Sequence, residues 1–224
     1  MMWYRDDPDL YEKEKAEVEA HFPDLRFAVQ DGVVYVRGSF PIIFEGQVLD
    51  RYSVELQLPR THPAALPVVR ETGGRIPRND DRHVNPADGT ACVMLPDERW
   101  RLWPPGTPLV KYLTGPLHSY FLAQTMVEEG EPWPHGEWAH GTKGILQYYC
   151  ELLKTTDLRV IIAYLEYIAA KKVKGHWPCP CGSNRRLRDC HLGVVAGLRE
   201  KISRHDASKS LDALRAAGRV GNSK

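Results

Sequence analysis

The chain has 224 residues, of which 42% are hydrophobic and 26% are charged, as in ordinary soluble globular proteins. This length allows one large domain, or one domain with a small annex. No run of about eighteen apolar residues occurs, so we expect no membrane-spanning segment. The polar, acidic N-terminus lacks the basic start and apolar block of a secretory signal, and we expect a cytoplasmic protein.

The net charge of +1 hides a division of the chain into an acidic and a basic part. Residues 171–224 hold 13 Lys and Arg against 4 Asp and Glu, whereas residues 1–170 hold 17 against 25. Such an asymmetry suggests two modules with different partners. We therefore expect a main domain over residues 1–172 and a small tail over residues 173–224. A basic tail does not by itself indicate nucleic-acid binding, and we expect neither nucleic acid nor a membrane as a partner.

The first third of the chain predicts one helix followed by an antiparallel meander. The helix covers residues 7–22, where Asp7 or Asp9 can cap the first turn and Pro8 fits within it. Apolar alternation and turn residues then predict four strands, at residues 25–30, 33–40, 50–59 and 66–73. An Asp-Gly pair between the first two strands is a strong hairpin signal.

The chain then changes from irregular segments to helices, which predicts an α+β fold. Residues 71–108 lose periodicity, and so long an irregular stretch in a compact protein is usually functional. We expect Trp100 and Trp103 within it to clamp the region against the helices. Helical patterns follow at residues 108–130, 144–153, 157–173, 194–203 and 208–217. A break is expected at Gly115-Pro116 in the first of them, because proline lacks the backbone N–H.

Four potential metal ligands form a compact pattern near the end of the chain. Cys179-Pro-Cys181 is followed, after eight further residues, by Cys190-His191. These side chains supply the tetrahedral set of nitrogen and sulfur ligands that Zn²⁺ prefers, and a site with four protein ligands is structural rather than catalytic. Such a site adds folding energy to a tail with little apolar content. Of the two cysteines that lie outside this pattern, Cys150 is expected to be a plain core residue.

This cysteine-rich stretch resembles the SEC-C motif, a short zinc-binding element found at the ends of bacterial proteins and in the SecA translocase. The match covers about thirteen residues and includes every expected ligand. The resemblance implies one structural zinc ion and a docking role toward protein partners.

A different cysteine lies on the irregular segment "HVNPADGTACVMLPDERW", residues 83–100. Cys92 follows a tight Asp-Gly turn, which favours an exposed position on a fixed loop, as a cysteine nucleophile requires. Asn85 carries an amide that can donate to an oxyanion or hold the loop. His83 is expected to bond backbone groups and brace the loop rather than to act as a base. No basic neighbour or helix N-terminus precedes Cys92, so a strongly depressed pKa is not expected.

The order of elements around this loop resembles the core of ubiquitin-conjugating enzymes: a helix, an antiparallel meander, proline-bearing segments, a His-x-Asn motif, a cysteine turn and a Trp-Pro pair. The matching residues are Pro59, His62, Pro63, Pro67, Val68, His83, Asn85, Gly89, Cys92, Trp103 and Pro104. Val84 departs from the family, which usually has proline there, and Thr90-Ala91 replaces a bulkier pair. Over roughly residues 8–170, the resemblance implies a ubiquitin-conjugating-enzyme-like core with C-terminal helices, to which the small zinc-bound tail is added.

Together with a SEC-C tail, this core resembles the bacterial conjugating-enzyme-like proteins of antiphage operons, notably CBASS. The resemblance implies an acyltransferase that carries the C-terminus of a protein as a thioester on Cys92 and passes it to a lysine amine. The partner would be a nucleotidyltransferase similar to cyclic GMP-AMP synthase, or a ubiquitin-like modifier. Asn85 would steady the oxyanion or its loop, and Asp88 or Asp97 would orient or deprotonate the lysine.

Two other functions fit the same residues. A non-catalytic module of the same fold would bind a partner's tail without using Cys92. A Cys-His hydrolase would pair Cys92 with His83, His118 or His140, and it would turn over simple esters or peptides.

Overall fold

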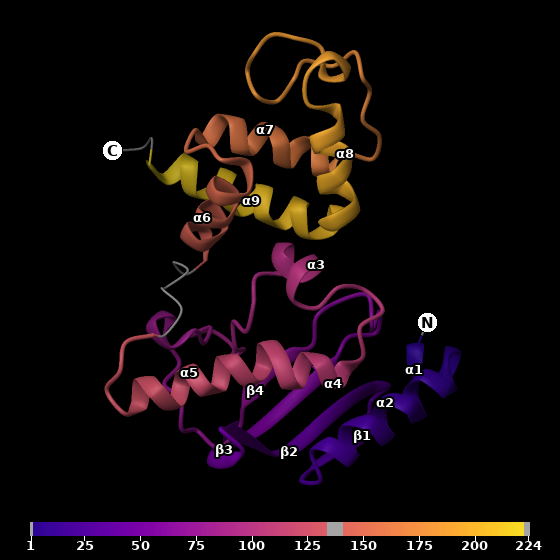
Figure 1. The fold of residues 1–224 in the computed structure, drawn as a ribbon, viewed down its shortest axis with the longest axis vertical. Helices are drawn as coiled ribbons and strands as arrows, with labels where there is room; N and C mark the ends of the chain where they lie inside the picture. Colours follow the sequence, from indigo (N-terminus) through magenta and orange to yellow (C-terminus); the bar gives the residue numbers. More distant parts are fainter. Residues whose placement is uncertain (1, 134–140, 222–224) are drawn as a thin grey trace. The chain divides into compact units, whose positions relative to one another are not determined.

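A computed structural model describes residues 2–133 and 141–221 of the chain, which divides into two compact units (Figure 1). The first unit comprises Met1–Met94 and Arg101–Gly136, and the second comprises Leu95–Trp100 and Glu137–Lys224. The chain thus contributes a six-residue segment to the second unit and then returns to the first.

The first unit contains a four-stranded antiparallel sheet in the order β1-β2-β3-β4, as the alternating segments predicted. The strands are β1 (Leu25–Gln30), β2 (Val33–Phe44), β3 (Gln47–Leu58) and β4 (Val68–Glu71). β2 and β3 extend beyond the expected segments because a second tight turn joins them. In this turn Glu45 and Gly46 have φ values of 49° and 79°, which lets Phe44 pair with Gln47.

Helices cover this sheet and close the core of the first unit (Figure 1). They are α1 (Trp3–Asp6), α2 (Pro8–His21), α4 (Leu109–Tyr112), the π-helical turn η3 (Leu113–Leu117) and α5 (His118–Glu128), with the short 3-10 turn η1 (Asp80–Arg82). Asp7 caps α2 as predicted, since its carboxylate accepts the N–H of Leu10 at 3.1 Å. The break expected at Gly115-Pro116 is the turn η3, where proline removes one helical donor.

Aromatic packing fixes α5 on the sheet of the first unit. Phe121 of α5 stacks on Tyr52 of β3, with ring centroids 4.6 Å apart, and contacts Phe40 of β2 at 5.8 Å. All three rings are buried. Val54, Leu56 and Leu58, which lie on the same face of β3 as Tyr52, are buried as well. The loop that follows β4 is attached to this core, because the N–H of Ala91 donates to the carbonyl of Val69 in β4.

The second unit is helical. It contains the 3-10 turn η2 (Pro96–Glu98), the start of α3 (Arg99–Leu102), α6 (Thr142–Leu153), α7 (Leu158–Ala169), the 3-10 turn η4 (Leu187–Asp189), α8 (Leu192–Lys201) and α9 (Arg204–Gly221). α7 and α9 lie side by side (Figure 1). Ile161, Leu165 and Leu211 are buried in their shared core, and Cys150 of α6 packs against this core.

The division that we expected between residues 172 and 173 falls inside this second unit. The physical reason is that α6 and α7 bury their apolar faces against the helices that follow the cysteine-rich stretch. Residues 173–224, the tail that we expected, are too few to form a hydrophobic core of their own. The architecture is α+β, and no helix within residues 2–133 and 141–221 is long and apolar enough to cross a membrane.

Candidate functional site

The loop that bears Cys92 is a small hairpin attached to the end of the sheet. Val84 and Ala91 form an antiparallel bridge, and the N–H of Cys92 donates to the carbonyl of His83 at 2.8 Å. The N–H of Ala91 donates to the carbonyl of Val69 in β4, also at 2.8 Å. The backbone on the N-terminal side of Cys92 is therefore tied to a strand of the core.

The tip of this hairpin is held by its own side chains. The Asn85 Oδ1 accepts the N–H of Ala87 at 3.0 Å, while Asp88 accepts both the N–H and the hydroxyl of Thr90, at 3.0 and 2.7 Å. Gly89 has a φ of 71°, which favours glycine, so the tight turn expected here is present. Because the Oδ1 of Asn85 is engaged, its Nδ2 remains a donor with no acceptor in the described part of the chain.

Helix α5 supports the same loop from the other side. The Tyr120 hydroxyl donates to the carbonyl of His83 at 3.3 Å, and the Gln124 amide donates to the carbonyl of Arg82 at 2.6 Å. These two residues were not among the predicted site residues. No local sequence signal marks them, because they lie 37 and 42 residues away from the carbonyls that they bind.

His83 lies in the left-handed backbone region, with a φ of 51°, and its carbonyl accepts from Cys92. Its ring packs on Trp133, with centroids 4.2 Å apart. This arrangement agrees with the bracing role that we expect for His83, which acts here through its backbone. The role of its imidazole in any reaction stays a prediction.

Cys92 is an exposed residue whose thiol is nevertheless not activated by its surroundings. Partial burial by the surrounding loops raises the pKa of the thiol, and the carboxylates of Asp80 and Asp88 raise it further. The structure thus agrees with the expectation of no strongly depressed pKa. Most of the thiol is protonated at neutral pH, and an efficient reaction requires an acceptor group that is itself activated.

The two candidate carboxylates have different environments. Asp88 is exposed on the Cys92 loop, and its hydrogen bonds from Thr90 lower the pKa of its carboxyl. Asp97 belongs to the second unit and is 2% exposed, and its carboxylate accepts from the hydroxyls of Tyr149 and Ser210. A buried carboxylate with both oxygens engaged is not open to an incoming amine. Asp88 is therefore the better candidate of the two.

The remaining predicted residues lie in separate places. Trp103 is fully buried in the first unit and donates to the carbonyl of Pro108 at 3.1 Å, whereas Trp100 belongs to the second unit. The two tryptophans therefore belong to different units, and the clamp that we expect them to form stays a prediction. The Nε2 of His118 accepts the N–H of Ile43 at 3.1 Å, so this imidazole is engaged by β2. His140 lies outside the described residues.

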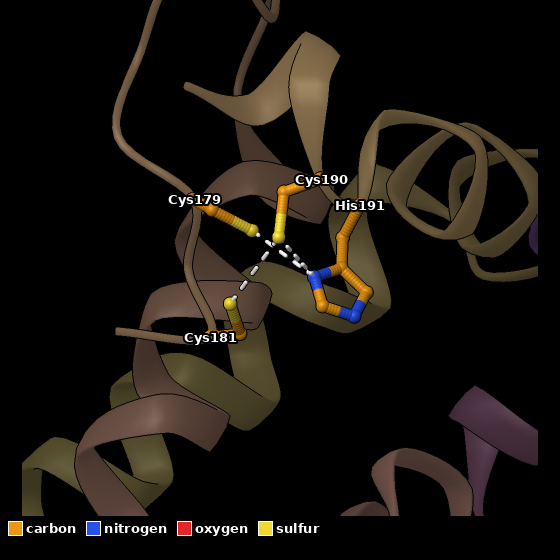
Figure 2. Close-up of side chains that lie close together, drawn as sticks. All are labelled: Cys179, Cys181, Cys190 and His191. Carbon is orange, nitrogen blue, oxygen red and sulfur yellow. Dashed lines mark hydrogen bonds between the residues drawn. The ribbon is translucent and has the colours of Figure 1, made fainter. Parts of the chain in front are cut away.

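The four predicted metal ligands come together in the second unit (Figure 2). The ligand atoms of Cys179, Cys181, Cys190 and His191 all lie within 4.8 Å of one another, close enough to hold a metal ion. The Nδ1 of His191 is 3.2 Å from the Sγ of Cys179 and 3.1 Å from that of Cys190, which in turn is 3.7 Å from the Sγ of Cys181. A tetrahedral ion with bonds of about 2.3 Å to sulfur requires sulfur atoms roughly 3.8 Å apart. The donor set and its spacing therefore fit such an ion.

A short hairpin brings the two ends of this cluster together. The N–H of Cys179 donates to the carbonyl of Arg185 at 2.8 Å, and the N–H of Leu187 donates to that of Trp177 at 2.7 Å. The Nδ1 of His191, the residue directly before α8, lies beside the sulfur atoms of Cys179 and Cys190. This local pairing explains why thirteen residues are enough to assemble four ligands.

Ser183 supports the thiolates of the cluster. Its hydroxyl lies 3.2 Å from the Sγ of Cys181 and 3.5 Å from that of Cys190. Hydrogen bonding by Ser183 lowers the pKa of Cys181, whereas burial raises the pKa of Cys179. A thiolate is the form that binds a metal, so Cys181 is more readily prepared for it than Cys179.

The chain matches none of the known protein families against which it was compared, and no curated protein and no solved structure matched it.

Proposed function

We propose that the protein is an acyltransferase of the ubiquitin-conjugating type, in which Cys92 carries the C-terminus of a protein as a thioester. The observation that supports this most is the placement of Cys92, exposed on a hairpin whose backbone is bonded to β4. A thioester carrier needs a reachable sulfur in a fixed position, and rigid scaffolds commonly present reactive residues on such loops. The order of sequence motifs around the loop supports the same function.

The chemistry consists of two exchanges at one carbonyl carbon. The Cys92 thiol loses its proton to the solvent, and its sulfur attacks an acyl group that another protein has activated, forms a C–S bond and expels the activating group. A lysine amine then attacks the thioester, the C–N bond forms, the C–S bond breaks and the amine loses a proton. Because the pKa of Cys92 is raised, the first exchange requires an acyl group that is itself well activated.

Asn85 and Asp88 have separate tasks in this proposal. The free Nδ2 of Asn85 is the donor for the oxyanion of either tetrahedral intermediate, while its Oδ1 keeps the loop folded. The Asp88 carboxylate, exposed and ionised, orients the lysine ammonium by charge. The bracing of His83 keeps the backbone of Cys92 in place.

The second unit contributes a structural zinc ion in this account. Cys179, Cys181, Cys190 and His191 would hold the ion with no position left for a substrate, so its contribution is to the fold. The likeness of this stretch to the SEC-C motif supports zinc and a docking role toward a protein partner. A nucleotidyltransferase similar to cyclic GMP-AMP synthase, or a ubiquitin-like modifier, is the proposed cargo, with antiphage defence as the setting.

A serine in place of Cys92 tests the acyl-carrier chemistry. Cys92→Ser, co-expressed with the genes next to its own, should accumulate an oxygen ester that resists the mild hydroxylamine treatment that cleaves the wild-type thioester. Cys150→Ser is the matched control, because this cysteine packs against the core of the second unit. It should keep the wild-type thioester. A Cys92→Ser protein and a wild type that both remain without an adduct would contradict the proposal.

A non-catalytic binding module is the second candidate, and the raised pKa of Cys92 favours it. A binding module would retain its partner in a pull-down from the same co-expression with Cys92→Ala as well as with the wild type. An acyl carrier would lose the covalent species in that variant.

A further inference from the structure

A small cavity in the first unit lies beside the hairpin that bears Cys92. Its volume is about 270 Å³, and its walls come from β4, from the loop after β4 and from the hairpin itself. Small-molecule sites usually enclose about 300–1,000 Å³. The cavity therefore has the size for one side chain rather than for a cofactor.

The cavity adjoins the backbone that leads to Cys92. Gly89 of the hairpin lines it, and the next residue, Thr90, forms an antiparallel bridge with Arg70, which also lines it. Cys92 is two positions beyond Thr90, which is about 7 Å along an extended chain. A peptide joined to the Cys92 sulfur can therefore reach the cavity within its first few residues.

Two arginines, Arg70 and Arg78, give this cavity a positive charge. The Nε of Arg70 donates to the carbonyl of Asp88 at 3.4 Å, and its Nη1 lies 3.9 Å from a carboxylate oxygen of Glu55. Arg78 has no hydrogen bond or ion pair with any residue in the described part of the chain. Because a guanidinium carries five N–H donors, both arginines keep donors for an anion.

The carboxylate of Glu71, which also lines the cavity, is engaged elsewhere. Its oxygens accept the N–H of Gly73 at 2.6 Å and the N–H of Arg75 at 2.9 Å. These bonds hold the loop after β4, and Glu71 forms no ion pair with Arg70 or Arg78. The positive charge of the cavity is thus not cancelled by its own wall.

The guanidinium of Arg78 lies directly against the backbone of the hairpin. A methyl group added at Gly89 would be only 2.9 Å from the Cζ and the Nε of Arg78. The buried side chains of Ile76 and Val84 form an apolar part of the same wall. This combination fits an acidic side chain, whose methylene groups contact the apolar wall while its carboxylate accepts N–H bonds from the guanidinium.

We infer that the cavity is a subsite for an acidic side chain, a glutamate or aspartate within a few residues of the group that Cys92 carries. Arg78 binds the carboxylate, and Arg70 adds positive charge. The identity of the substrate, the C-terminal tail of a cargo protein, rests on the proposed function. The cavity and its charge rest on the contacts above alone.

Chloroacetyl peptides test the subsite in the full chain without any acyl donor. The thiol proton of Cys92 passes to the buffer, the thiolate attacks the CH₂ carbon of the probe, a C–S bond forms and chloride leaves. Three probes carry glutamate amide directly after the chloroacetyl group, after one glycine or after two, and each has a glutamine counterpart of equal length. Digestion and mass spectrometry assign the modification to Cys92.

We expect the wild type to react about threefold to tenfold faster with the glutamate probe than with its glutamine counterpart for at least one spacing, because the arginines hold the carboxylate near the sulfur. Both probes meet the same thiolate, so the ratio of the two rates does not depend on the pKa of Cys92. Added salt should reduce the ratio, since it screens exposed charges.

Arg78→Gln and Arg26→Gln form a matched pair, since each removes one positive charge from the first unit. Arg26 lies on β1, at the opposite edge of the sheet from β4. Only Arg78→Gln should abolish the preference for glutamate, with the rate of the glutamine probe unchanged. Arg78→Glu should instead prefer a probe with arginine in place of glutamate. Arg70→Gln should weaken the preference, and it provides the same test if the Arg78 variants do not fold.

Equal rates for the glutamate and glutamine probes at every spacing in the wild type, or a preference that persists in Arg78→Gln, would overturn the subsite. The thioester assay gives an independent readout of the proposed function. A glutamate preference that depends on Arg78, together with the absence of any thioester in the wild type, would retain the subsite and reject the acyl carrier. A normal thioester without any glutamate preference would do the reverse.

Discussion

The candidate sites of the two units are held in place by different interactions. In the first unit, a sheet with buried alternating residues exists independently of the loop, and backbone hydrogen bonds fix Cys92 to it. In the second unit, the side chains of Cys179, Cys181, Cys190 and His191 come from the hairpin and from the residue before α8, and a metal ion held by them would join these two segments. A hydrophobic core can thus present a reactive side chain on a loop, whereas a bound metal ion would add local order to a short segment that has few apolar residues of its own.

Removal of the proposed metal ion should have the largest effect on stability. This effect should be confined to the second unit. His191→Ala, or chelation of the wild type, is expected to cost up to about 10 kcal/mol, the scale of apparent binding energies for structural zinc. Hydrogen exchange should accelerate in residues 174–191 and remain slow in β2 and β3. Cys150→Ala is the control and should keep the metal, because Cys150 lies outside the cluster. Loss of protection in the sheet would mean that the first unit has no independent stability.

A cavity in the sheet should give the second largest effect, confined to the first unit. Phe40 and Phe44 lie on the same strand, but Phe40 is fully buried and Phe44 is 51% exposed. Phe40→Ala should lower the free energy of unfolding by about 3–5 kcal/mol, whereas Phe44→Ala should stay within about 0.5 kcal/mol. Denaturant titration measures both, and the metal content should not change. Similar costs for the two variants would place Phe40 outside the core.

The ion pair of Asp50 and Arg75 should give the smallest effect, and one that depends on pH. The guanidinium of Arg75 lies 2.7 and 2.5 Å from the carboxylate oxygens of Asp50, and its hydrogen bonds lower the pKa of that carboxyl. Because the folded pKa is below the unfolded value of about 4, the stabilisation is complete above that pH and disappears as the pH falls through the folded value.

Asp50→Asn should therefore destabilise the first unit by about 1 kcal/mol at pH 7, a modest figure because Arg75 is 39% exposed. The difference from the wild type should shrink when thermal unfolding is repeated between pH 4 and pH 2. A difference that is constant over this range would contradict the role of the ionised carboxylate.

Local patterns were enough to predict the regular elements of the sheet. The cap at Asp7 and the alternation that ends at Leu58 depend on neighbours along the chain, and both are present. The turn at Glu45-Gly46 was missed, because a glutamate at positive φ is not a usual hairpin residue. The metal ligands were predictable for the same reason as the strands, since all four lie within thirteen residues.

Contacts between distant segments could not be predicted in this way. Tyr120 and Gln124 support the Cys92 loop only because α5 packs on the sheet. Asp97 was expected beside Cys92 from its closeness in sequence, yet it is buried among residues of the second unit. Such side-chain partners depend on tertiary packing. Local patterns in a single sequence do not indicate which distant residues will come into contact.

The central claim is that Cys92 carries an acyl group, and intact-protein mass spectrometry tests it most directly. Wild type and Cys92→Ala would be co-expressed with the genes next to their own and weighed before and after treatment with hydroxylamine. We expect an adduct on the wild type alone, which hydroxylamine removes and whose mass identifies the cargo. Bare masses for both proteins with every neighbouring gene present, or the same adduct on Cys92→Ala, would contradict it.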